Sequence, residues 1–455
     1  MKITKRLADF IVNTRYEDLP QEAVELAKHS FLDTAGIALG GSLEKAPRIV
    51  SRLIKQWGGH PVASVVGQGF KATVQHAALI NGISADIIGF SDVSVTSIHH
   101  PSAGICPAIW ALGEQRQSPG KDIILAHIVG TEIANKIGFG VKPRFHQKGW
   151  DPVCVLGTFG ATAAAGKLLG LNSSRMANAL GIAGAQASGI RGNMGTMSKS
   201  YRAGRAAENG VTAASLAQMG FTGNTTIMEI RDGLLQTFGD GVDGNKILEN
   251  LGNPLDFISP GITLKPYPSC TSSHTAIYGT LKLKKEHRIV PENVESVECG
   301  VVPKVADLLK FPCPRNTFEA KYSIQFCVAL ALIEGKVTIG SFSEETMRDP
   351  QILDLMKRVK MDVALELAKL GYSPEVAPFG CRVTVRLKTG ENYTCRVNKG
   401  PWEPETPPSW DEIAEKYHSC AESVLSPKEI EESSQIIQGL EKTDNILRLM
   451  DILRA

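Results

Sequence analysis

The sequence has 455 residues, of which 43% are hydrophobic and 21% charged, and its formal net charge is only +2. This is the composition of a globular protein with two or three hydrophobic cores, and it excludes the strongly basic field that a nucleic-acid-binding protein would present. No uncharged apolar run reaches the roughly 18 residues that a transmembrane helix needs, so no membrane partner is expected. Nine scattered cysteines without a C-x-x-C pair predict reduced thiols in the cytoplasm and no paired zinc-ligand spacing.

Helices are predicted over most of the first 260 residues, beginning with an amphipathic helix that contains Leu7, Phe10 and Ile11. Segments rich in Ala and Gly follow later in this region, and small residues let helices approach one another closely. The expected helices cover a segment opened by Pro20 and residues 74–90, 105–117, 121–138, 157–171, 177–189 and 205–219.

The pattern changes after Gly261. Residues 294–302 alternate like a strand, and residues 381–397 resemble a β-hairpin. Helices are expected between them, at 323–334 and 350–370.

The predicted fold is therefore mainly α, with a large all-helical domain and a smaller inserted α+β domain that resembles a lid. The large domain is expected to comprise residues 1–262 and 405–455, because the chain is helical again from Trp410. The α+β domain is expected at residues 263–404.

A polar segment, Ser91–Ser102, leads into the helix predicted at 105–117 and contains Asp92 and His100. A histidine at a helix entrance is well placed to meet an anion or to exchange a proton. The alternative is a surface histidine beside an ordinary capped helix start.

Asp151 precedes the Ala-rich helix predicted at 157–171. It is a candidate base, although aspartate at a helix start is common for capping reasons alone. Both interpretations remain open.

A Gly-rich stretch leads into Lys199, Arg202 and Arg205. In a helix these three cations lie at i, i+3 and i+6, and together they form one cationic stripe. The spacing fits neither a P-loop nor a dinucleotide fingerprint. The stripe is therefore either a carboxylate-binding site or a solvated basic face.

A fourth candidate segment runs from Lys265 to His274, where prolines fix a rigid turn before a predicted helix. Cys270 and Ser273 lie within it. Cys270 and His274 are a possible nucleophile and base, but a cysteine beside a helix start is often only small and buried.

Taken together, these segments resemble the MmgE/PrpD family, which contains 2-methylcitrate dehydratase, cis-aconitate decarboxylase and iminodisuccinate epimerase. The resemblance covers nearly the whole chain, and the order and spacing of the motifs make it specific. The matching stretches are His100–Ala103, Gly157–Ala161, Lys199–Ala207 with Gly220–Gly223, Lys265–Cys270 with His274, Glu319–Gln325 and Pro408–Trp410.

The resemblance implies a large helical domain built from both chain ends, an inserted α+β domain, and an active site in the cleft between them. It also implies a homodimer that needs no metal or organic cofactor. The implied substrates are small di- and tricarboxylates, and the implied chemistry passes through loss or transfer of a proton beside a carboxylate.

His100, Lys199 and His274 fall on positions that have catalytic or substrate-binding roles in the family. Asp92 matches the last acid of the family's Asp-aromatic-Asp-Asp-Thr motif. The chain departs from that motif at its other polar positions, Gly89, Ser91 and Val93.

Asp151 and Arg202 each stand where the family pattern has a histidine. An acid and a permanent cation thus replace two groups that titrate near neutral pH. Arginine binds carboxylates well but cannot act as a general base at this pH.

The sequence predicts a cofactor-independent lyase, a dehydratase or decarboxylase, that acts on an acid of the citrate or aconitate type. An epimerase or isomerase in the same cleft, with Asp151 as a second base, is one alternative, and a non-catalytic carboxylate-binding protein is another. The predicted catalytic residues are His100, Lys199, His274 and Asp151. The predicted substrate-binding residues are Asp92, Arg202, Lys265, Cys270 and Ser273.

Overall fold

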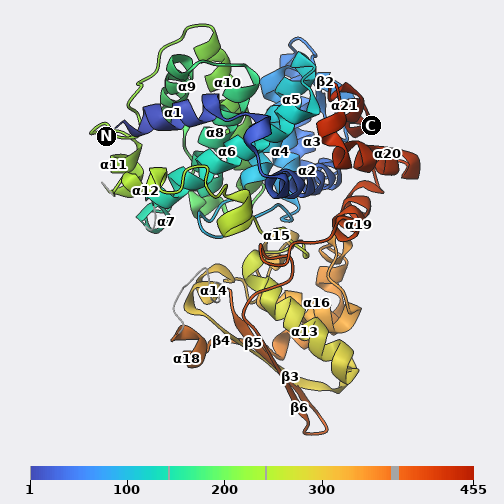
Figure 1. The fold of residues 1–455 in the computed structure, drawn as a ribbon. Helices are drawn as coiled ribbons and strands as arrows, with labels where there is room; N and C mark the ends of the chain where they lie inside the picture. The colour runs from blue at the N-terminus through green and yellow to red at the C-terminus, as the bar shows by residue number, and fades with distance from the viewer. Residues whose placement is uncertain (1, 142–143, 241–242, 370–378) are drawn as a thin grey trace. The chain divides into compact units, whose positions relative to one another are not determined.

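The computed structural model describes residues 2–141, 144–240, 243–369 and 379–455 (Figure 1). The chain forms two compact units. The larger unit comprises Met1–Leu264 and Pro408–Ala455, and the smaller unit comprises Lys265–Pro407. Among the described residues, no helix combines the length and the apolar character needed to cross a membrane.

The larger unit is a cluster of helices with one short antiparallel hairpin, β1 (Ala63–Val65) and β2 (Phe70–Ala72). Its helices are α1 (Ile3–Asn13), α2 (Gln21–Ser42), α3 (Lys45–Trp57), α4 (Val74–Ile87), α5 (Pro101–Arg116), α6 (Gly120–Val141), α7 (Arg144–Gln147), α8 (Pro152–Leu168), α9 (Ser173–Gln186), α10 (Ser198–Gln218), α11 (Leu234–Gly239), α12 (Asn245–Leu248), α19 (Trp410–Ala421), α20 (Pro427–Gln438) and α21 (Leu447–Arg454).

Helices α4, α5, α8 and α10 form the centre of this unit, and they pack closely because glycine and alanine line their contacts. A Cβ added to Gly82 of α4 would lie 2.7 Å from the Cα of Gly204 in α10. A Cβ added to Gly204 would lie 2.3 Å from the carbonyl oxygen of Leu79. The backbones of the two helices are therefore in direct contact.

The C-terminal helices return to the larger unit. Helix α19 packs against α2, where a Cβ on Gly36 would lie 3.0 Å from the ring of Tyr417. The buried Tyr417 hydroxyl is 2.6 Å from the hydroxyl of Ser433 in α20. Residues from both ends of the chain thus share one core.

The smaller unit contains a four-stranded sheet in the order β4-β3-β5-β6. Strands β3 (Val294–Val301) and β4 (Val359–Val363) are parallel, whereas β5 (Cys381–Leu387) pairs antiparallel with β3 and with β6 (Asn392–Val397). Helix α13 (His274–His287) packs on β5 and β6, and α16 (Ile324–Glu334) packs beside it (Figure 1). The remaining helices are α14 (Pro303–Leu308), α15 (Thr317–Ala320), α17 (Pro350–Lys357) and α18 (Leu365–Ala368).

The predicted fold class, mainly α with a smaller α+β part, is confirmed. The prediction of one helix at 350–370 is wrong, because the chain forms α17, then β4, then α18. Residues Val359 and Val363 pair with β3 in a parallel ladder, and this long-range pairing decides the structure of a segment whose local pattern also suits a helix. Leu370 lies outside the described residues. The hairpin β1–β2 was not predicted.

The contact between α4 and α10 can be tested with Gly204→Ala. We expect the variant to lose about 1–3 kcal/mol of unfolding free energy, since the new methyl group overlaps the backbone of α4. The higher helix propensity of alanine, worth about 1 kcal/mol, offsets only part of this loss. Urea denaturation measures it. Gly439→Ala is the control, because its Cβ would meet one atom at 3.6 Å. Equal stability of the two variants would contradict the close contact.

Candidate active site

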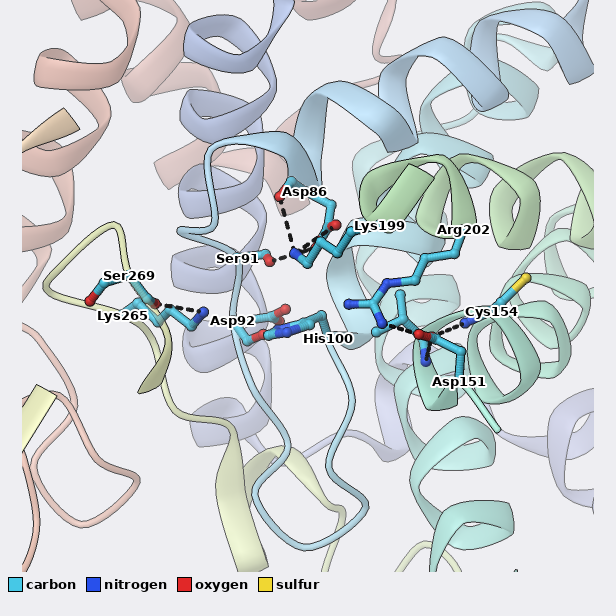
Figure 2. A network of polar contacts seen from close by, with 11 residues as sticks. Asp86, Ser91, Asp92, His100, Asp151, Cys154, Lys199, Arg202, Lys265 and Ser269 are labelled. Carbon is cyan, nitrogen blue, oxygen red and sulfur yellow. Dashed lines mark hydrogen bonds and ion pairs between the residues drawn. The ribbon is translucent and has the colours of Figure 1, made fainter. Parts of the chain in front are cut away.

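The first candidate site feature is a buried ion pair between Asp86 and Lys199 (Figure 2). The Lys199 Nζ lies 2.9 and 2.8 Å from the two carboxylate oxygens of Asp86. Asp86 stands near the C-terminus of α4 and Lys199 in the first turn of α10. Gly82 lies about one turn before Asp86, and Gly204 lies more than one turn after Lys199. The contact between these two glycines therefore fixes the position of the ion pair.

Burial and charge oppose each other at Asp86. Burial alone would raise the pKa of its carboxyl, but the positive charges of Lys199 and Arg202 hold that pKa below its usual value. Burial also lowers the pKa of the Lys199 ammonium, and the Asp86 carboxylate offsets part of that shift. Asp86 is thus the group that favours a protonated Lys199.

Arg202, one turn along α10 from Lys199, forms an ion pair with Asp151 (Figure 2). The other carboxylate oxygen of Asp151 accepts hydrogen bonds from the amides of Val153 and Cys154, at 2.9 and 3.3 Å. Asp151 is therefore the N-cap of α8, as the alternative interpretation of the sequence had it. One of its oxygens caps α8, and the other forms the ion pair with Arg202.

The predicted stripe of three cations does lie on one helix, but each cation faces an acid. Arg205 pairs with Glu208 in the next turn of α10. Together with the pairs at Lys199 and Arg202, this makes the surface of α10 here a set of ion pairs and not a solvated basic face.

His100 occupies the N-cap position of α5, and its Nδ1 lies 2.6 Å from the backbone carbonyl oxygen of Asp92. A carbonyl only accepts hydrogen bonds, so Nδ1 carries the proton. In a neutral ring this leaves Nε2 as the basic nitrogen. The loop before His100 is held by the backbone bridge between Val93 and Thr263 and by the Lys416 ammonium, which donates to the carbonyl of Phe90 at 3.2 Å.

Asp92 lies behind His100 and is fully buried. Its carboxylate accepts hydrogen bonds from the hydroxyls of Ser30 and Ser102 and from the Ser102 amide. Burial raises the pKa of Asp92 to about 6 despite these bonds. The Ser102 hydroxyl also contacts Nε2 of His127 at 2.9 Å, and burial lowers the pKa of His127 to about 3. Asp92 therefore organises the start of α5 from within the core.

The smaller unit holds the remaining predicted residues. Lys265 is buried, and its Nζ donates to the carbonyl of Ser269 at 3.2 Å. The hydroxyl of Ser273 bonds to the Cys270 carbonyl and lies 2.8 Å from the Ser269 hydroxyl. Cys270 is a half-buried free thiol.

His274 is the first residue of α13, is buried, and packs edge-on against the ring of Tyr267 at 5.3 Å. An imidazole at a helix N-terminus is well placed to meet an anion. Across the described residues, no group of three or more His, Cys, Asp or Glu side chains is arranged to share a metal ion.

The sequence analysis missed Asp86. Its signal was an acid inside a helix of apolar and small residues, with no Lys or Arg at i±3 or i±4. A buried carboxylate requires a partner, and here the partner had to come from another helix. Within the larger unit the structure brings together His100, Asp151, Lys199 and Arg202, and adds Asp86 to them (Figure 2).

Family models match both parts of the chain. The MmgE/PrpD N-terminal domain matches residues 5–245, and the MmgE/PrpD C-terminal domain matches residues 267–442. The chain belongs to the MmgE/PrpD family. The family resemblance found in the sequence motifs is thereby confirmed.

Its relatives in this family include two kinds of named enzyme. The chain is 27% identical to the cis-aconitate decarboxylase of Homo sapiens, over 100% of this chain and 95% of the relative. It is 25% identical to the cis-aconitate decarboxylase of Aspergillus terreus, over 100% and 96%. It is 22% identical to the 2-methylcitrate dehydratase of Salmonella typhimurium, over 85% and 83%. Decarboxylases and dehydratases are both lyases, so these MmgE/PrpD relatives support the predicted enzyme class.

The role of Asp86 can be tested through the charge on Lys199. Asp86→Asn removes the carboxylate that offsets the effect of burial, so the pKa of Lys199 falls further. Lys199 then loses its proton at a lower pH than in the wild type. As the pH is raised, the variant should therefore lose its affinity for anions earlier than the wild type does. Citrate affinity measured by calorimetry from about pH 6 to about pH 10 reports this shift.

Asp232→Asn is the control for this experiment, because Asp232 is an exposed acid of the same unit. It should leave the pH profile unchanged. An Asp86→Asn profile that coincides with the wild type would show that Asp86 does not set the charge state of Lys199.

Proposed function

We propose that this protein is a cofactor-independent lyase that acts on a small di- or tricarboxylic acid of the citrate or aconitate type. The observation that carries the proposal is the pair of neighbouring cations Lys199 and Arg202 next to His100, whose imidazole is held in one tautomer. The cis-aconitate decarboxylases and the 2-methylcitrate dehydratase among the relatives support it.

In the proposed mechanism, Lys199 and Arg202 attract a substrate carboxylate as fixed positive charges. A proton on the carbon beside that carboxylate becomes more acidic, because the same cations stabilise the enolate-like charge that develops when it leaves. In a dehydration, the carbanion then expels the hydroxide group of the neighbouring carbon, which takes up a proton and leaves as water. In a decarboxylation, the bond between carbon and a carboxylate breaks instead, carbon dioxide leaves, and the electron pair left on the carbon takes up a proton from the general acid.

His100 is one candidate for the group that moves the proton. With its Nδ1 proton directed to the carbonyl of Asp92, a neutral His100 presents Nε2 as a base. His274 of the smaller unit is the other candidate, and we propose that Lys265, Cys270 and Ser273 contribute to binding the same substrate. A homodimer in the cytoplasm is also part of the proposal, and it rests on the family resemblance and on cysteine usage.

An epimerase in this family would need a base on each face of the substrate carbon. Asp151 was the predicted second base, but its oxygens are engaged by Arg202 and by the N-terminus of α8. These contacts support a binding or structural role for Asp151. The lyase is therefore the function that the site supports best.

A reaction screen in deuterated water tests the function. The protein is incubated with citrate, 2-methylcitrate, cis-aconitate and related acids, and NMR follows deuterium uptake, water loss and carbon dioxide release. We expect net loss of water or carbon dioxide from one of these acids. Deuterium uptake at constant substrate would favour the epimerase, and binding without any exchange would favour a non-catalytic protein.

We expect turnover of cis-aconitate itself to be weak. Two of the three acids and the threonine of the family motif are replaced here by Gly89, Ser91 and Val93. Two histidines of other family segments are replaced by Asp151 and Arg202. A decarboxylation rate with cis-aconitate on the order of 10 s⁻¹ would contradict this part of the proposal.

Lys199→Ala and His274→Gln separate binding from proton transfer. Loss of the ammonium should weaken the binding of an anionic substrate about 10- to 150-fold, the value of a hydrogen-bonded charge contact. Glutamine keeps the polarity of His274 but cannot cycle a proton, so single-turnover rates should fall about 10²- to 10⁴-fold with binding nearly intact. Calorimetry and single-turnover kinetics measure the two effects.

His287→Gln is the matched control for His274→Gln, because His287 is an exposed histidine at the other end of α13. Melting curves of all variants exclude simple unfolding. If the Lys199 and His274 variants lose binding and rate equally, in proportion to their loss of stability, both residues are structural and the site lies elsewhere.

A further inference from the structure

The four charged groups Asp86, Lys199, Arg202 and Asp151 form one cluster in the larger unit (Figure 2). The side chains of Lys199 and Arg202 are only 11% and 10% exposed, and those of Asp86 and Asp151 only 0% and 2%. The charge of Arg202 acts on both Asp86 and Lys199, and the charge of Asp151 acts on Lys199. The four groups are therefore electrostatically one unit.

This cluster has no excess positive charge. Two buried carboxylates balance its two cations, and the next cation of α10, Arg205, is balanced by Glu208. Asp92, the acid nearest to His100 along the chain, adds a negative charge above its pKa of about 6. A substrate carboxylate that binds here is thus attracted by the cations of the cluster and repelled by its acids.

We propose that Asp151 is a specificity-determining residue that makes the protein select dicarboxylic over tricarboxylic acids. The inference rests on the proposed function and narrows its substrate class. One substrate carboxylate can be held by Lys199 and Arg202 at the edge of the cluster. For each further carboxylate of the substrate, the cluster offers no cation without an acidic partner, and the negative charge of Asp151 repels that carboxylate.

Asp151 suits this role better than Asp86. Asp86 holds Lys199 with both of its oxygens, so its removal changes the charge state of Lys199 as well as the balance of the cluster. The two carboxylate oxygens of Asp151 have different partners. One accepts from the amides at the start of α8, and the other faces Arg202. An asparagine in its place keeps the capping oxygen, removes the charge and replaces the acceptor of Arg202 with an amide NH2.

The experiment compares three acids that share a three-carbon chain: butyrate, glutarate and tricarballylate, with one, two and three carboxylates. Their affinities for the wild type and Asp151→Asn are measured by calorimetry at about pH 8, where all their carboxyl groups are ionised. We expect the wild type to bind glutarate more tightly than tricarballylate. In Asp151→Asn the affinity for tricarballylate relative to glutarate should rise about 10-fold or more, the range of a charged contact.

Asp349→Asn is the matched control. Asp349 caps α17 as Asp151 caps α8, with a proline at the first helical position and bonds to the amides of Gln351 and Ile352 at 2.7 and 3.4 Å. It therefore reports what an Asp-to-Asn change at a helix cap does to stability alone, and it should leave the order of the acids unchanged.

Two results would overturn the inference alone. One is tighter binding of tricarballylate than of glutarate by the wild type. This test does not depend on whether the variant folds. The other is a folded Asp151→Asn variant whose relative affinities match those of the wild type. Failure of every acid in this series and of citrate to bind either protein would overturn the proposed function together with the inference.

Discussion

The ion pair between Asp86 and Lys199 depends on two helices whose backbones touch. Because Gly82 and Gly204 have no side chains, α4 and α10 approach closely enough to set the carboxylate near the end of one helix against the ammonium at the start of the other. A buried carboxylate or ammonium without its partner would be strongly destabilising, so the pair and the helix contact require each other. The arrangement also fixes Arg202, which lies one turn further along α10.

His100 depends on a different part of the same unit. Its ring is oriented by a backbone carbonyl, and that carbonyl belongs to Asp92, whose side chain is tied to the start of α5 through Ser102. The loop that contains Asp92 thus determines the tautomer of His100. Lys416 of α19 holds the same loop through a hydrogen bond to the Phe90 carbonyl. Because α19 belongs to the C-terminal part of the chain, both ends of the sequence determine how this imidazole is presented.

The sequence was informative where the pattern is local. The helices of the larger unit follow from apolar periodicity and from small residues, and the hairpin of β5 and β6 follows from alternation around a turn that contains Gly390. It was misleading at β4, whose strand character comes from pairing with β3 about sixty residues earlier in the chain. The cations at Lys199 and Arg202 were recognised from their spacing on one helix. Their acidic partners were harder to find, because Asp86 and Asp151 lie 113 and 51 residues away along the chain and only the fold brings them together.

Asp151 and Arg202 form a buried ion pair. The resemblance in the sequence motifs implies a histidine at each of these two positions in the family, and histidine changes charge near neutral pH. In this chain Asp151 and Arg202 depend on each other, because an arginine alone would leave a buried cation unbalanced and an aspartate alone a buried anion. The two departures from the family pattern are therefore one physical change. Beside this pair lie Asp92, whose pKa burial raises to about 6, and His100, whose Nδ1 contacts the Asp92 carbonyl. The proposed function therefore assigns anion binding and proton movement to different side chains.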